Sequence, residues 1–130
     1  MPIVDSTTNI ETSLLPTTLN LSVYRGDTFL VILKMWQDRQ RTNPVNLAGF
    51  TGRSEFRNQI TPFAVIATPT ITVNDRNGTV ETGAVTIKIA NTTALAPGTY
   101  NWDFQLNDGS STRTYLAGTI TIVADITAEA

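Results

Sequence analysis

The chain has 130 residues, a formal net charge of −2, and neither cysteine nor histidine. This length suits one domain with a substantial core. The lack of cysteine excludes disulfides and thiolate chemistry, and the lack of histidine removes the most frequent general base and zinc ligand. The nine Lys and Arg residues are scattered and offer little to a phosphate backbone. We therefore expect no enzymatic activity, no cofactor, no metal site and no nucleic-acid partner.

The sequence also lacks the features of a membrane or exported protein. No apolar run approaches the roughly 18 residues of a membrane span, and the first residues lack the basic and apolar segments of a signal peptide. We expect a chain that is made in the cytoplasm and has no membrane partner. A charged fraction of 15%, with many Thr and Asn residues, suits a surface that packs against copies of itself or against fixed neighbours.

The chain divides into three parts. Residues 1–19 show neither a strand nor a helix period, and Pro2 and Pro16 interrupt any regular element, so we expect an extended N-terminal arm or a disordered terminus. Residues 20–127 form the domain, and residues 128–130 are a short tail. Because free sheet edges accept a strand from another chain, the Thr-rich arm is a candidate donor.

From residue 20 onward, short runs rich in Val, Ile, Thr and aromatic residues alternate with turn residues. This pattern predicts an all-β protein, an immunoglobulin-like antiparallel sandwich of about seven strands. The expected strands are 20–25, 28–37, 50–58, 63–73, 84–90, 99–107 and 112–124.

Some strands alternate clearly and others do not. One face of the 99–107 run carries Tyr100, Trp102, Phe104 and Leu106, so we expect that face in the core. The same alternation places Val85, Ile87, Ile89, Ile120 and Ile122 inside. By contrast, residues 29–33 and 63–67 are apolar at every position, which predicts cover on both faces, either by the domain's own arm and loops or by another chain.

Several short motifs predict turns. Asn77-Gly78 and Asp108-Gly109 are dipeptides that accept positive φ and join neighbouring strands. Residues 91–95, which precede Pro97-Gly98, suit a single helical turn. The Arg25-Gly26-Asp27 tripeptide occurs in integrin ligands, but here it predicts a tight turn, with Arg25 free to pair with a carboxylate.

Few residues suggest chemistry. The carboxylates of Asp27, Asp38, Glu55 and Asp103 could supply a glycosidase-like acid and base, but they lie far apart in sequence. For Asp103 we expect instead a solvated side chain or one paired with an Arg on the next strand. Two turns, around Asp75 to Gly78 and Asn107 to Gly109, have oxygen ligands for Ca²⁺ but lack the spacing of a known calcium loop. We therefore assign no catalytic, cofactor-binding or metal-binding residue.

Aromatic side chains offer one further possibility. If Tyr24, Trp36 and Tyr115 were exposed together, they could stack on sugar rings as a carbohydrate platform, whereas the alternative is that each packs in the core.

The order of motifs over residues 20–127 resembles the short immunoglobulin-like domains of tailed bacteriophages, such as the N-terminal domains of baseplate upper proteins and related tail and fibre-adaptor proteins. The motifs that carry the resemblance are Arg25 to Phe29, Pro44 to Gly52, Ser54 to Arg57, Gly83 to Ile89, Thr92 to Tyr100, Trp102 to Leu106 and Thr114 to Ile122, closing at Asp125 to Thr127. The resemblance implies a building role in the virion and no catalytic residues. A full-length baseplate upper protein continues beyond such a domain, whereas this sequence ends at Ala130.

From these observations we expect a non-enzymatic virion structural protein of the tail, baseplate or fibre-adaptor region. One alternative is a capsid decoration protein of the phage head, and another is a carbohydrate- or receptor-binding module. The expected partners are other virion proteins and copies of this chain in a homo-oligomer, while a host glycan is a less favoured partner.

Overall fold

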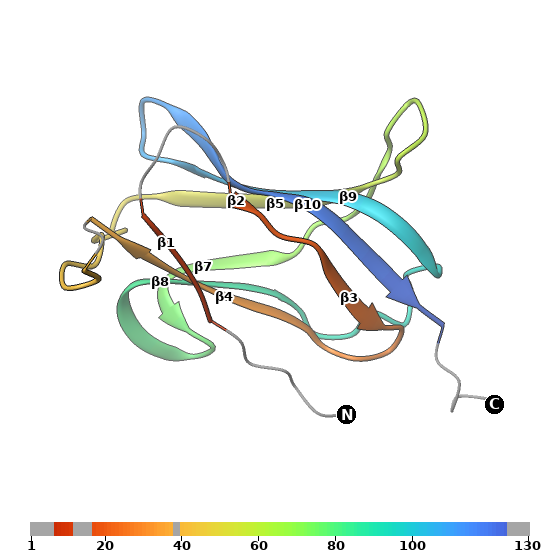
Figure 1. Ribbon diagram of the computed structural model, residues 1–130, viewed down its shortest axis with the longest axis horizontal. Helices are drawn as coiled ribbons and strands as arrows, with labels where there is room; N and C mark the ends of the chain where they lie inside the picture. The colour runs from red at the N-terminus through yellow and green to blue at the C-terminus, as the bar shows by residue number, and fades with distance from the viewer. Residues whose placement is uncertain (1–6, 12–16, 38–39, 125–130) are drawn as a thin grey trace.

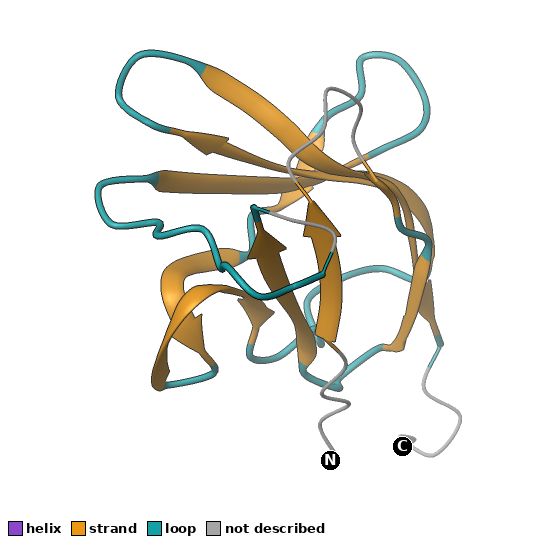
Figure 2. Cartoon of the chain, turned by 60° about the vertical axis from the view of Figure 1, so that its left-hand side comes forward, coloured by secondary structure: helices purple, strands orange, loops and turns teal. Residues whose placement is uncertain are grey.

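The computed structural model describes residues 7–11, 17–37 and 40–124, which contain strands and loops and no helix (Figure 2). Within these ranges, therefore, no helix could cross a membrane. The strands are β1 (Thr7–Glu11), β2 (Thr17–Thr18), β3 (Leu21–Tyr24), β4 (Phe29–Trp36), β5 (Thr51–Arg57), β6 (Val65–Ala67), β7 (Thr70–Arg76), β8 (Thr79–Ile89), β9 (Gly98–Asn107) and β10 (Thr112–Val123).

The strands form two sheets that pack face to face (Figure 1). The first sheet has the order β1-β4-β8-β7, and the second has the order β2-β10-β9-β5-β6, with β3 also paired with β10. In chain order, β4, β8 and β7 correspond to strands B, E and D of an immunoglobulin domain, and β5, β9 and β10 correspond to C, F and G. The all-β sandwich expected from the sequence is therefore confirmed, although the described residues form ten strands where about seven were expected.

The sandwich differs from the expectation in its pairing directions. Strand β1 runs parallel to β4, and both β2 and β3 run parallel to β10, so the fold is not wholly antiparallel. All three parallel pairs come from the first 24 residues. Thr7–Glu11 and Thr17–Thr18 lie in the segment expected to be an arm, and they pair within the chain. Because the arm's sequence shows no period, its strands could not be recognised from pattern alone.

The core lies between the two sheets and includes the expected aromatic residues. Tyr100, Trp102, Phe104 and Leu106 are all buried, which confirms the orientation of β9. The Trp102 ring meets Phe29 of β4 and Phe56 of β5 edge to face, with ring centroids 6.0 and 6.4 Å away. The Phe29 contact crosses the sandwich and stabilises the packing of one sheet on the other, whereas the Phe56 contact lies within the six-stranded sheet.

The connection from β8 to β9 contains a tyrosine corner, a feature of immunoglobulin folds. The Tyr100 hydroxyl donates to the main-chain oxygen of Ala96 at 2.7 Å, in the arrangement that immunoglobulin domains show at the start of strand F. The helical turn expected over residues 91–95 is not a helix in the structure. It is a turn in which the Leu95 amide donates to the Thr92 carbonyl.

The predicted turns are confirmed. Asn77 and Gly78, with φ of 44° and 99°, close the β7–β8 hairpin, and Asp108-Gly109 lies in the β9–β10 connection. Gly26, with φ of 99°, lies between β3 and β4, where only glycine takes such a value without strain. Arg25 has a partner other than the carboxylate considered for it, since its Nε donates to the Thr93 carbonyl at 2.9 Å.

The apolar run at residues 29–33 is buried on both faces, as expected. On the outer face, Ile32 pairs in register with Thr86 of β8. The hydroxyl of Thr86 accepts a hydrogen bond from the Asn77 amide at 2.7 Å and donates to the Asp75 carbonyl at 2.9 Å. The tip of the β7–β8 hairpin therefore folds back over this face, so the domain's own chain provides the cover.

The apolar run at residues 63–67 behaves differently, and the expectation that both its faces are covered is wrong. The expected strand 63–73 is interrupted at Thr68-Pro69 and forms β6 and β7, which belong to different sheets. Phe63 and Val65 remain 45% and 40% exposed. The run lies at the edge of a sheet, where no further strand of the described chain covers it.

Candidate functional site

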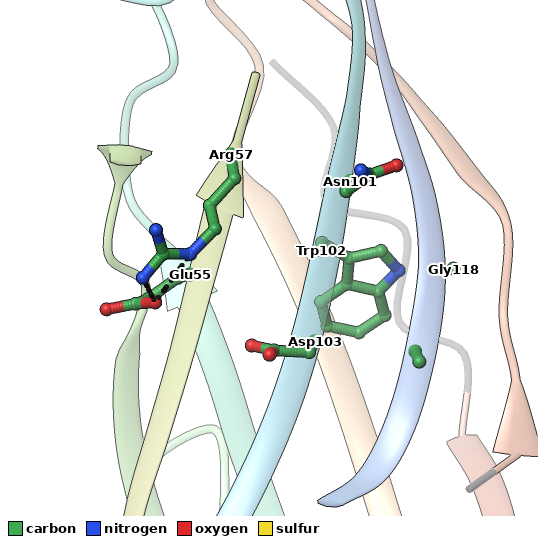
Figure 3. Close-up of a pocket in the computed structure, with 7 residues that line it drawn as sticks. Glu55, Arg57, Asn101, Trp102, Asp103 and Gly118 are labelled. Carbon is green, nitrogen blue, oxygen red and sulfur yellow. Dashed lines mark hydrogen bonds and ion pairs between the residues drawn. The ribbon is translucent and has the colours of Figure 1, made fainter. Parts of the chain in front are cut away.

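A hollow of about 290 Å³ opens on the outer face of the six-stranded sheet (Figure 3). It is lined by Glu55, Arg57, Asn101, Trp102, Asp103, Ala117 and Gly118. Strand register brings these residues together: Asp103 of β9 is paired on one side with Glu55 of β5 and on the other with Ala117 of β10. Because partners in register point to the same face, two carboxylates and a methyl group form one row. The small side chain of Ala117 leaves the space above β10 open.

Both oxygens of the Glu55 carboxylate accept hydrogen bonds from arginines of the same strand, β5. Arg53 Nε and Arg57 Nε each donate to it at 3.0 Å, to different oxygens, and each guanidinium adds a second hydrogen bond through Nη2. Burial alone would raise the pKa of Glu55, but the hydrogen bonds and charges of the two arginines outweigh it and hold that pKa below its ordinary value. These four hydrogen bonds fill the acceptor sites of the carboxylate.

Asp103 has the opposite electrostatic setting. Burial, and next the negative charge of Glu55, raise the pKa of Asp103 above its ordinary value. The expectation that Asp103 pairs with an Arg of the neighbouring strand is not met, because both arginines of β5 form their ion pairs with Glu55. In Figure 3 the Asp103 carboxylate lies on the far side of β9 from the Trp102 indole, which points toward β10.

Two carboxylates with separated pKa values are a pattern of acid–base catalysis. Here, however, Glu55 could act as a base or nucleophile only by giving up its arginine contacts. Of the three carboxylates from the sequence that lie in the described residues, the structure brings two together, Glu55 and Asp103. Asp27 lies in the turn between β3 and β4, and Asp38 lies outside the described residues. The arrangement is a polar cluster in which the arginines of β5 neutralise Glu55 within the same strand, with Asp103 of β9 beside it.

The turns considered for calcium use their oxygens to cap backbone amides. Asp75 Oδ2 accepts from the Gly78 amide at 3.1 Å, and Asn107 Oδ1 accepts from the Gly109 amide at 2.7 Å. Asp108 Oδ1 accepts from the amides of Ser110 and Ser111, and these backbone hydrogen bonds lower the pKa of Asp108. Local turn chemistry thus accounts for these side chains.

The three aromatic residues considered as a sugar platform do not share a surface. Tyr24 pairs in register with Val123 at one end of β10, whereas Tyr115 lies near the other end, roughly 26 Å away at the usual rise of a strand. Trp36 ends β4 in the other sheet, with the Lys34 ammonium 5.2 Å from its ring centre. A flat stacking platform is therefore not formed by these three side chains.

A second surface has a different character and follows one side of the sandwich. Residues 58–74, here called the charge-free edge, contain no Asp, Glu, Lys or Arg, and this is the longest such stretch in the sequence. They include β6, the last strand of one sheet, and most of β7, the last strand of the other. Only Thr68 and Pro69 separate these strands, so both sheet edges lie on the same side of the molecule.

The loop between β5 and β6 presents apolar side chains from this edge. Ile60 is 79% exposed, and Phe63 and Val65 also face solvent. The loop projects beyond the body of the sandwich at the upper right of Figure 1. Proteins normally protect such edges with charged residues, and the described part of this edge has none.

The loop is nevertheless anchored by hydrogen bonds. The Asn58 amide donates to the Ala64 carbonyl at 2.9 Å, and the Phe63 amide donates to the Ile60 carbonyl at 2.8 Å. Arg57 Nη1, which belongs to the guanidinium that binds Glu55, donates to the Phe63 carbonyl at 3.0 Å. Phe63 has a φ of 59°, which is uncommon for a bulky residue. Apolar side chains are thus displayed on a fixed backbone.

Sequence reasoning missed this surface because a continuous apolar run reads as a buried strand. The signal that would have indicated it is the absence of charge over residues 58–74, combined with Pro62 and Pro69, which confine any strand between them to an edge.

Comparison with known proteins adds no assignment, since no family model matches the chain and no curated protein matches it either.

Proposed function

We propose that this protein is a non-enzymatic structural module of a tailed-bacteriophage particle, in the tail, baseplate or fibre-adaptor region. The observation that carries the assembly role is the anchored loop of the charge-free edge, which displays Ile60, Phe63 and Val65 to solvent. The phage assignment rests on the order of motifs in residues 20–127, which resembles immunoglobulin-like virion domains.

An apolar edge that is exposed to water costs free energy. Ile60, Phe63 and Val65 gain free energy when they are removed from water, by about 25 cal/mol for each Å² of apolar surface. A loop that is already fixed loses little conformational entropy on binding, so more of that gain remains as affinity. Apolar anchors on a rigid backbone are typical of the central residues of protein interfaces. The loop therefore suits contact with another protein.

The non-enzymatic part of the proposal has separate support. The chain has no histidine or cysteine, and the acceptor sites of the Glu55 carboxylate are filled by Arg53 and Arg57. With its acceptor sites filled in this way, the carboxylate would have to give up its arginine contacts before it could act as a base or nucleophile.

The proposal is tested by measuring the solution mass of the chain by light scattering after mixing it with the virion proteins encoded beside it. We expect a stoichiometric complex with at least one of them. Ile60→Lys, which places a charge on the loop without touching the core, should weaken a complex made through this edge. A wild-type chain that forms no complex with any of these proteins would contradict the proposal.

A further inference from the structure

We infer that the charge-free edge docks a second copy of this chain, with β6 of one copy lying antiparallel to β6 of the other. This inference rests on the proposed assembly role and names the partner at the surface that carries it.

One side of β6 has no partner strand among the described residues. Among the described strands, β6 pairs only with β5 and ends its sheet. A strand at a sheet edge presents unpaired backbone donors and acceptors, which another strand can satisfy. Pro62 and Pro69 bracket this strand and lack amide protons, so they confine the pairing to the residues between them. The available edge is short and has defined ends.

A second copy of this chain suits the edge because the edge carries no charge. Each copy has a formal net charge of −2, so two copies repel each other least where they meet through an uncharged surface. The nearest charged side chain, Arg57, forms an ion pair with Glu55 at 2.5 Å. A two-fold contact brings the same patch of both copies together, so the patch must be complementary to itself. A neutral apolar strand meets that condition.

In an antiparallel pair centred on Val65, this residue lies opposite its own copy, and Ala64 lies opposite Ile66. The Phe63 side chains, which leave the strand at the fixed turn, then flank the contact on both sides. This arrangement removes from water the side chains that are exposed in the single chain. The two six-stranded sheets would join into one continuous sheet.

Light scattering over a range of concentrations tests self-association on the full chain. The mass should rise from 14.1 kDa toward twice that value as the concentration approaches about 1 mM, where even millimolar association is visible. Val65→Lys should weaken the association by about tenfold or more, because a lysine would face its own copy.

Val80→Lys is the matched control. Val80 is 86% exposed, but it lies at the tip of the β7–β8 hairpin, at the opposite end of the molecule from the β5–β6 loop (Figure 1). This variant makes the same change of residue type and should associate as the wild type does. A wild-type mass that stays at one chain at every concentration would overturn the inference, as would equal effects of the two lysine variants.

Single cysteines test the geometry, since the chain has none of its own. Opposed residues in an antiparallel pair have Cα atoms about 4.5–5.5 Å apart, which a disulfide can span. Under mild oxidation, Val65→Cys should form a covalent dimer much faster than Val80→Cys. Equal rates would overturn the proposed pairing.

The two proposals can fail separately. A chain that stays monomeric by itself but binds another virion protein would refute the docking of a second copy and leave the assembly role standing. A chain that dimerises through β6 but binds no virion protein would refute the assembly role and leave the docking of a second copy standing.

Discussion

Gly118 is the point at which β10 meets the segment that leads into β3. An added Cβ at this glycine would overlap the Leu19 carbonyl oxygen and approach Asn20 Oδ1 to 2.8 Å. The same carbonyl accepts a hydrogen bond from Trp102 Nε1 at 2.8 Å. One methyl group would therefore displace a segment that is also bound to the core.

We predict that Gly118→Ala lowers the free energy of unfolding by about 1–3 kcal/mol, the usual range for an overpacked site. The φ of Gly118 is not positive, so the change tests steric overlap without a backbone penalty. Urea denaturation measures the effect. An unchanged midpoint would show that the Leu19 segment does not lie where the structure places it.

Asp103 gives a prediction that depends on pH. Its raised pKa means that the folded protein binds this proton more tightly than the unfolded chain does, so ionisation of Asp103 destabilises the fold as pH rises. Asp103→Asn removes that charge and keeps an oxygen acceptor. We expect a higher melting temperature for this variant at pH 7.

The same comparison at low pH is the control. At about pH 3, below the ordinary value of 3.8, the Asp103 carboxyl is largely protonated in both states, so the advantage of the variant should shrink. A variant that is less stable than the wild type at pH 7 would indicate that the Asp103 carboxylate has a stabilising partner.

Among the elements, the β7–β8 hairpin covers the outer face of β4, and ion pairs stabilise the hairpin near its tip. Glu81 forms ion pairs with Arg76 and Lys34, each at 3.0 Å. Hydrogen bonds from Arg76 and then Lys34 lower the pKa of Glu81 to about 2. The stabilisation is complete above the unfolded value of 4.5 and is lost as pH falls from there toward 2.

Glu81→Gln should therefore remove part of the acid sensitivity of the fold. At pH 7 we expect a loss of at most about 1 kcal/mol, because the pair is partly exposed. Near pH 2 the variant and the wild type should be nearly equal in stability. Melting curves at both pH values measure this difference, and a loss that does not depend on pH would contradict the role given to the ion pairs.

Two truncations test what the N-terminal segment contributes to the fold. Removing residues 1–16 takes away β1 and leaves Leu19 in place, whereas removing residues 1–19 also takes away the acceptor of Trp102 Nε1. The amide of Leu19, which donates to Ala117 at 2.9 Å, is lost as well.

The longer truncation should be less stable than the shorter one by about 1–3 kcal/mol, the cost of a buried donor left unpaired. Thermal melts of the two truncated proteins provide the comparison. If the two proteins melt together, then Leu19 contributes nothing to the fold and the arm is separable, as the sequence suggested.

The elements also show what the sequence can and cannot predict. Alternation along β9 determines which face is buried, because one side chain in two must leave water. The position of β6 could not be inferred in the same way, since an apolar run fits a central strand as well as an exposed edge. The meeting of Glu55 and Asp103 depends on the register between β5 and β9, which pattern within one strand does not contain. For the same reason, no pattern in the sequence predicted that β1, β2 and β3 pair in parallel with their neighbours.

For the whole molecule, the described surfaces divide into two kinds. The outer face of β4 is covered by the domain's own hairpin, and the hollow on the other sheet is organised by ion pairs within the chain. The charge-free edge has neither form of protection. A domain whose sheet faces are covered or ion-paired within the chain, but whose charge-free edge is exposed, is suited to contact other proteins through that edge.

The proposed assembly role in a phage particle is tested most directly by quantitative mass spectrometry of purified particles, produced by the source that encodes this chain. We expect the polypeptide to be present in a fixed number of copies for each particle and to remain after washes that remove loosely bound proteins. Particles that contain none of it, although the chain is produced during infection, would contradict the central claim.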